Sequence, residues 1–257
     1  MGLFERLRRL YVLRRHPISH GIWNQVIDQG GPFTGLSAVE RAHLRELTTL
    51  FLHRKRLVGA DDLFVTDKMA VTIAAQACLL ILKLGLSDYA GWSEVVIYPG
   101  AFRVVRNKVD QIGLVSAQAR TLSGESWLRG PVILSWDDVV RDLESAHVGH
   151  SVVIHEFAHK LDMRNGRANG MPPLHADMQI CQWTEAFSDA FNHMQQRIAH
   201  HHRPALDSYA ATDPAEFFAV VSEVFFTDPE TLMAEYSAVY QQLTYFYRQD
   251  PGGRTCG

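Results

Sequence analysis

The stretch VVIHEFAHKLDM, residues 152–163, constrains this chain more than any other feature of its sequence. Three aliphatic residues open it, and apolar residues continue at helical spacing, which predicts a helix packed on a core. On such a helix His155 and His159 lie four residues apart and share a face, with Glu156 beside them. Polar groups on a buried helix must be satisfied. The fold must therefore bring partners for both imidazoles to one place.

A metal ion is the partner that this pattern indicates. Two imidazoles four residues apart can reach one zinc ion, and a glutamate after the first can accept a proton from water without being a ligand. We therefore predict His155 and His159 as ligands of Zn²⁺ and Glu156 as the general base of a metallopeptidase. Lys160 is unusual, because peptidases with this pattern commonly have an uncharged residue there.

A catalytic zinc has three protein ligands and an open position, so a third ligand is needed. The extended pattern HExxHxxGxxH is ruled out, because Asp162 and Asn165 stand at its glycine and histidine positions. Two later glutamates remain as candidates. Glu185 has Asp189 four residues after it, on the same helical face, as an acceptor for a ligand histidine.

Glu216 is the second candidate. Tyr209 precedes it by seven residues, and Glu223 follows two helical turns later as a residue that solvation alone could explain. Glu216 also has an ordinary structural interpretation, since Asp213, Pro214 and Glu216 together form a typical helix start. Spacing alone favours Glu216 over Glu185 only slightly. Asp162 could hold a helix end or accept a hydrogen bond from a ligand imidazole.

The rest of the chain predicts an α+β fold that is mostly helical. Residues 1–90 form a helical region, with Ser37 and Glu40 as a capping box and an apolar central helix before Gly85. A small sheet is expected over residues 94–136, beside the active-site helix, with QIGLVSA as a further strand. We assign residues 91–257 to the catalytic core.

Composition excludes several classes of partner. The formal net charge is −3, so we expect no direct binding to nucleic acid. Three cysteines without a CxxC pair favour a reducing cytoplasm. The N-terminal residues are basic and amphipathic, yet they lack a signal-peptide pattern and a myristoylation pattern, and no apolar run is long enough to span a bilayer. We therefore expect a cytoplasmic protein without a membrane partner.

Several motifs together resemble the Mlc titration factor A family of bacterial zinc metallopeptidases. They are the stretch quoted above, the NGMPPL that follows it, and SYAATDPAEFFAVVSEVFF. In the first half, TDKMAVTIAAQACLLIL and VVIYPGAF are similar to the same family, so the likeness covers nearly the whole chain. The family's site is similar to that of the anthrax lethal factor catalytic domain. The resemblance implies a zincin-like fold and aminopeptidase-like hydrolysis of peptides.

The resemblance also implies a role for each site residue. His155, His159 and Glu216 become the metal ligands, Glu156 the general base, and Tyr209 a group that stabilises the oxyanion or positions the water. Glu185 then lies on the helix surface or behind a ligand.

The sequence is also compatible with a function other than catalysis. The family takes its name from sequestering a transcriptional repressor of sugar uptake, so a regulatory binding protein with secondary peptidase activity is the alternative. A structural zinc without turnover is a third possibility.

Overall fold

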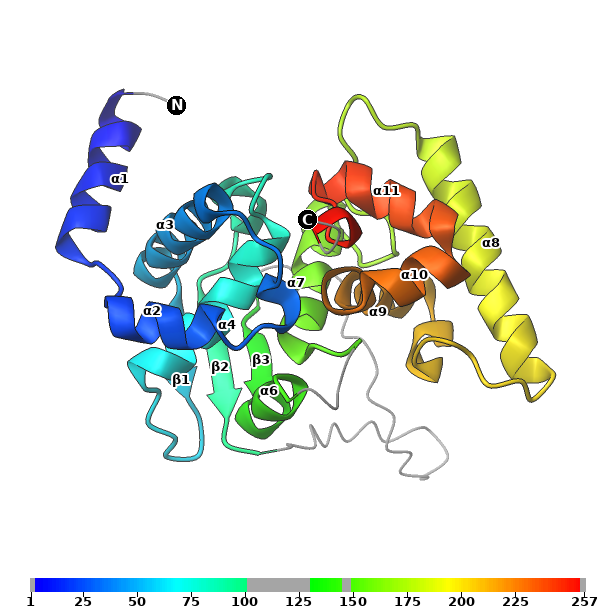
Figure 1. Ribbon diagram of the computed structural model, residues 1–257, viewed down its shortest axis with the longest axis horizontal. Coiled ribbons are helices and arrows are strands. Elements are labelled where there is room, and N and C mark those ends of the chain that lie inside the picture. The colour runs from blue at the N-terminus through cyan, green and yellow to red at the C-terminus, as the bar shows by residue number, and fades with distance from the viewer. Residues whose placement is uncertain (1–2, 101–129, 145–148, 255–257) are drawn as a thin grey trace, which may run out of the picture.

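The computed structural model describes residues 3–100, 130–144 and 149–254 (Figure 1). The described part is mostly helical, with one small sheet, as the sequence predicts. Its α-helices are α1 (Leu3–Arg15), α2 (His20–Ile27), α3 (Ala38–Arg54), α4 (Asp67–Leu80), α6 (Trp136–Asp142), α7 (Val152–Asp162), α8 (Ile180–Ala199), α9 (Pro214–Thr227), α10 (Pro229–Glu235) and α11 (Ser237–Tyr247). Short 3-10 turns are η1 (Gly31–Phe33), η2 (Leu86–Tyr89), η4 (Met163–Asn165), η5 (Ser208–Ala211) and η6 (Gly252–Arg254).

The sheet has three parallel strands in the order β1 (Arg56–Gly59), β2 (Glu94–Tyr98) and β3 (Val132–Ser135). Its register aligns Val58 with Val96 and Val96 with Ile133. Strands β2 and β3 lie within the predicted range of 94–136. The further strand expected at QIGLVSA falls outside the described residues.

Strand β1 lies within residues 1–90, where the sequence predicted a helical region and no strand was expected. The helical sequence pattern SAVERAHLRELTTLFLHRKRL extends to Leu57, whereas α3 ends at Arg54. Lys55 explains the difference, because its buried side chain turns inward and its Nζ donates to the carbonyl oxygens of Tyr89 and Trp92, both at 2.5 Å. Its backbone is consequently extended, and the next four residues pair with β2.

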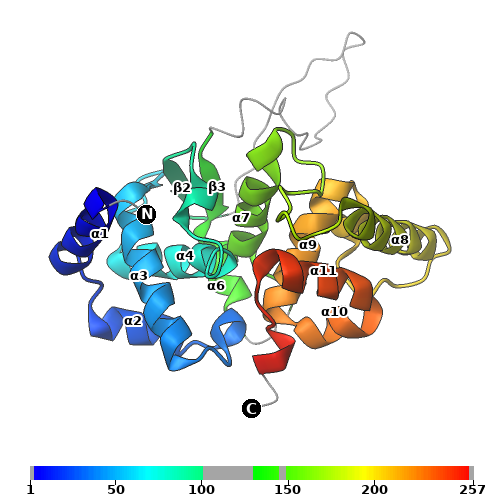
Figure 2. The same ribbon diagram turned by 90° about the horizontal axis from the view of Figure 1, so that it is seen from above.

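One continuous cluster of buried apolar side chains runs from Ile18 to Tyr247. Helix α4 lies at its centre, and α7 packs against α4, β3 and α9 (Figure 2). The capping box of Ser37 and Glu40 is present at the start of α3, as predicted. The division at residue 90 stays a prediction, and the sheet and the core both draw on residues from either side of it.

No helix within residues 3–100, 130–144 and 149–254 combines the length and the apolarity needed to cross a membrane.

Candidate metal centre

Helix α7 presents two different faces. Its N-cap is Ser151, whose side chain accepts a hydrogen bond from the backbone N–H of Ile154. Val153, Phe157 and Leu161 are buried against the core, together with their apolar neighbours. The opposite face carries the half-buried imidazoles of His155 and His159, as four-residue spacing on a helix requires.

Helix α9 supplies a carboxylate to these two imidazoles. Glu216 Oε2 lies 3.1 Å from His155 Nε2 and 3.4 Å from His159 Nε2, and the two Nε2 atoms are 3.2 Å apart. A tetrahedral ion with ligands at 2.0–2.1 Å needs ligand atoms about 3.3 Å apart. The three atoms therefore already form one face of a tetrahedron of the right size. Among the described residues, this is the group of side chains that could hold a metal ion.

The electrostatics of the group fit a cation. Glu216 Oε2 is buried and, within the described part of the chain, has no hydrogen-bond partner of ordinary geometry. Burial raises the pKa of Glu216, but His155 and His159 outweigh it and hold that pKa well below its usual range. Burial lowers the pKa of His155, but Glu216 and Glu223 outweigh it and raise the pKa to about 10. In the metal-free protein a proton on His155 thus pairs with these carboxylates. The nitrogen and oxygen atoms of the same group are ligands that suit a divalent ion.

Glu223 lies behind His155 and corrects the interpretation that it is a plain solvated residue. The residue is buried, with 6% of its surface exposed. Oε1 lies 2.7 Å from His155 Nδ1, and Oε2 accepts from the backbone N–H of Ser151 at 2.8 Å. A carboxylate on the second ring nitrogen fixes the tautomer in which Nε2 is free for a metal. Its spacing of seven residues after Glu216, on one helical face, was the available signal.

Glu156 and Tyr209 lie close to this group. Glu156 is half-buried, and its charge contributes to the raised pKa of both His155 and Tyr209. The Tyr209 ring lies 6.1 Å from the His155 ring, and 48% of the side chain is exposed. Partial burial, then the carboxylates of Glu216 and Glu156, raise the pKa of Tyr209. Its hydroxyl therefore keeps its proton at neutral pH and can donate it.

The competing third ligand is not brought to the centre. Glu185 is exposed on α8, as is Asp189, and the converging ligand atoms belong to His155, His159 and Glu216.

Asp162 holds the loop that follows α7. Its Oδ2 accepts from the backbone N–H groups of Asn169 and Gly170, both at 2.8 Å, and burial raises the pKa of Asp162 to about 6. None of its hydrogen bonds within the described residues reaches His159. Of the two roles considered from the sequence, Asp162 therefore has the structural one.

Lys160 points away from the metal ligands. Its buried Nζ donates to the carbonyl oxygen of Gly130 at 2.8 Å, and burial lowers the pKa of Lys160 to about 8. Lys160, the unusual charged residue of the motif, thus contributes to the packing of α7 beside the sheet.

Comparison with known proteins agrees with this geometry. Residues 4–248 match the family described as glucose-regulated metallo-peptidase M90. A protein named Mlc titration factor A from Salmonella arizonae is 43% identical over 224 residues, which cover 85% of this chain and 87% of that protein. Proteins of the same name from Salmonella agona and Salmonella typhimurium are 42% identical over 224 residues, covering 85% of this chain and 83% of each relative. The chain belongs to the glucose-regulated metallopeptidase family M90.

Proposed function

We propose that this chain is a zinc-dependent peptidase of the zincin type, with His155, His159 and Glu216 as the ligands. The observation that carries the proposal is the triangle of Nε2, Nε2 and Oε2 atoms with sides of 3.1–3.4 Å, beside a half-buried glutamate. Three ligands of this kind leave a fourth position for water or substrate, which is the arrangement of catalytic rather than structural zinc sites.

The residues around the ion divide the chemistry among them. Bound zinc supplies Lewis acidity, which lowers the pKa of water and polarises the scissile carbonyl. Glu156 accepts the proton of the attacking water and passes it to the leaving amine. Tyr209, which stays protonated, donates a hydrogen bond to the oxygen on which negative charge develops. Glu223 keeps the His155 ring oriented throughout.

The substrate class follows from the family resemblance. We propose aminopeptidase-like hydrolysis of short peptides in the bacterial cytoplasm. A free α-amine on the substrate would then be required, because an aminopeptidase recognises it.

Zinc content and hydrolysis of amino-acid anilides and short peptides, with free and blocked N-termini, test the proposal. Glu156→Gln should retain zinc and lose activity, while Glu216→Gln should lose both. Glu185→Gln, the matched control on exposed α8, should retain both. If the wild type binds zinc and cleaves no substrate, or if Glu185→Gln is the change that releases the metal, the proposal is refuted. Equal cleavage of blocked peptides would refute the aminopeptidase assignment alone.

A regulatory function is the second candidate, and the name of the relatives, Mlc titration factor A, supports it. Under this proposal the chain binds a transcriptional repressor of sugar uptake. Binding of the purified repressor by wild type and by Glu156→Gln separates the two functions. Equal binding by both would make sequestration independent of hydrolysis. Truncation is unsuitable for this purpose, because Leu243 and Tyr247 of α11 are fully buried.

A further inference from the structure

Helix α1 exposes an unusual concentration of apolar side chains. The described residues contain eleven large hydrophobic side chains that are exposed, and four of them lie on α1: Phe4 (88%), Leu7 (55%), Leu10 (50%) and Tyr11 (63%). Single exposed hydrophobic residues are normal on a protein surface, whereas contiguous ones mark interaction sites.

These four side chains form one stripe, because residues three and four apart share a helical face. At 100° per residue they cover an arc of about 120°. Exposed arginines lie along it: Arg6 on one side, Arg8 and Arg15 on the other, and Arg14 within the arc, one turn beyond Leu10. The whole helix contains five arginines and one acidic residue, Glu5, so its formal charge is 5 − 1 = +4.

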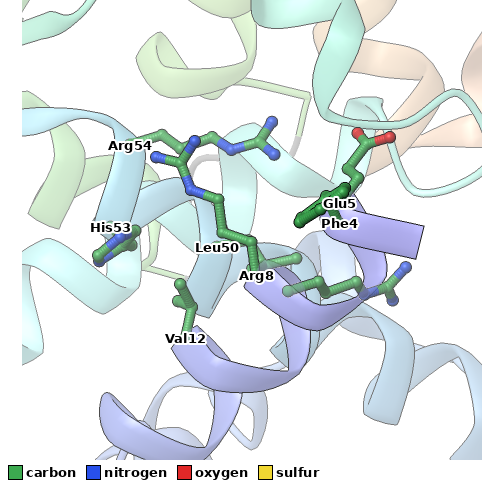
Figure 3. A pocket seen from close by; sticks show the side chains of 8 residues that line it. Phe4, Glu5, Arg8, Val12, Leu50, His53 and Arg54 are labelled. Atoms are coloured by element: carbon green, nitrogen blue, oxygen red, sulfur yellow. The ribbon is translucent and has the colours of Figure 1, made fainter. Parts of the chain in front are cut away.

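The inner side of α1 is what attaches it to the protein. Val12 is buried, and Arg9 forms an ion pair with Glu46 of α3. Between the two helices lies a cavity of about 290 Å³, and Figure 3 shows Arg8 and Arg54 among the side chains around it. Helix α1 lies at the edge of the molecule (Figures 1 and 2). Phe4 lies at the rim of this cavity (Figure 3), whereas Leu7, Leu10 and Tyr11 do not line it and are exposed.

We propose that α1 lies on anionic lipid surfaces, with its apolar stripe in the headgroup region and its arginines on the lipid phosphates. A stripe of Phe, Leu and Tyr bordered by arginines is the pattern of helices that lie in the membrane interface. Each arginine near an anionic leaflet adds to the attraction. This inference departs from our expectation of no membrane partner, which was argued from the lack of spanning, signal and lipidation patterns.

Charge favours a lipid surface over a second copy of the chain. In a symmetric dimer through this face, each copy would present the same patch, so the bordering arginines of the two helices would be brought together. An anionic bilayer instead offers opposite charge along the whole helix, and it requires no matching shape. The proposal does not depend on the metal centre.

Co-sedimentation of the full chain with vesicles tests the proposal. The wild type should bind vesicles of phosphatidylglycerol and phosphatidylcholine, bind pure phosphatidylcholine poorly, and dissociate at high salt. Removing one bordering arginine, as in Arg6→Gln or Arg15→Gln, should lower the partition coefficient about fivefold. The double variant Phe4→Gln/Leu7→Gln should lower it at least about tenfold.

Phe64→Gln is the matched control, because Phe64 is 83% exposed and lies outside α1. It should bind vesicles as the wild type does. Circular dichroism of each variant checks that the fold is retained. The proposal is overturned if the wild type stays in the supernatant with anionic vesicles, or if Phe64→Gln reduces binding as much as the double variant. It is also overturned if the α1 variants alter only self-association or capture of an acidic protein, with lipid binding absent.

Discussion

At the scale of single residues, the orientation of His155 depends on a partner that takes no part in ligation. Glu223 contacts His155 Nδ1 and the backbone of Ser151, and the Ser151 hydroxyl donates to Gln76 Oε1 at 2.9 Å. This buried chain of hydrogen bonds connects α4, α7 and α9. These hydrogen bonds hold the His155 ring and the start of α7. We expect their loss to weaken metal binding more than it lowers the stability of the fold.

Glu223→Gln is therefore expected to weaken zinc affinity about 10–100-fold, the usual effect of removing a carboxylate behind a ligand histidine. The amide is uncharged, and its NH₂ group cannot accept from Ser151 N–H while its oxygen accepts from His155. Competition with a chromophoric chelator measures the affinity. Glu185→Gln controls for the loss of one acidic residue. Unchanged affinity in Glu223→Gln would show that the second nitrogen of His155 needs no carboxylate.

Zinc affinity should also rise with pH. The pKa of His155 is raised to about 10, so the metal-free protein carries a proton there at pH 7. The ion pairs of His155 with Glu216 and Glu223 stabilise the metal-free fold fully below about pH 6.5 and are lost as the pH rises through about 10. Zinc must displace that proton, so affinity should increase about tenfold per pH unit between pH 7 and 9. Chelator competition at several pH values, corrected for chelator protonation, measures the slope. A zinc affinity that does not change between pH 7 and 9 would mean that zinc displaces no proton from the ligands.

The sequence singled out the side chains that converge at the candidate metal centre and missed the role of the one behind them. His155, Glu156 and His159 are adjacent in a motif whose helical spacing determines their geometry. The local signal for Glu223 is limited to its seven-residue spacing from Glu216, because its partners lie 68 and 72 positions away. The choice of Glu216 over Glu185 likewise needed information beyond spacing, since both stand on helices of similar pattern.

At the scale of elements, the start of α9 determines where Glu216 lies. Asp213 caps this helix by accepting from the backbone N–H groups of Ala215 and Glu216 at 2.9 and 3.0 Å. The loop held by Asp162 packs on the same place, because a Cβ at Gly170 would lie 2.3 Å from the Pro214 carbonyl oxygen. The helix start is thus fixed from two sides.

Asp213→Ala should consequently reduce both stability and zinc affinity. Losing an N-cap costs about 1 kcal/mol, and fraying of the first turn displaces Glu216. Asp228→Ala is the matched control, because Asp228 caps α10 by accepting from Thr231 N–H. Both variants should unfold at lower urea concentration, while only Asp213→Ala should lose zinc affinity. Equal zinc affinity in the two variants would show that the N-cap of α9 does not influence the metal centre.

Gly170→Ala tests the second contact. Gly170 has φ of +78°, and an added methyl group would meet the Pro214 backbone. We expect a loss of at least about 2 kcal/mol in the free energy of unfolding. Gly166 also has a positive φ, of +126°, but open space around it, so Gly166→Ala should cost less. Urea unfolding compares the two. Equal losses would mean that backbone strain alone matters and that the contact with Pro214 does not.

The element that the sequence did not reveal is β1. Its four residues follow a strongly helical stretch, and the boundary depends on the contacts of Lys55 with Tyr89 and Trp92, more than thirty positions later. Short strands whose pairing is non-local are where single-sequence reasoning fails, since tertiary contacts override local propensity. The long helices, with their caps and apolar faces, carry local signals and were predictable.

At the scale of the whole molecule, the candidate ligands His155, His159 and Glu216 join α7 to α9 at the surface of a core that does not contain them. The continuous cluster from Ile18 to Tyr247 packs both helices independently of any ion. The chain differs in this respect from small zinc domains, in which metal binding supplies most of the free energy of folding. Its metal-free form should therefore be folded and only less stable.

Chelation of the metal should lower the melting temperature without removing helical structure at 25 °C. An ion present at a thousand times its Kd adds about 4 kcal/mol to the free energy of unfolding. For a chain of this size that corresponds to about 10 °C in Tm, measured by circular dichroism at 222 nm. Glu216→Gln controls for effects of the chelator itself, because its Tm should be the same with and without zinc. Unfolding of the wild type at 25 °C on chelation would contradict the prediction and would make the ion part of the core that folds the protein.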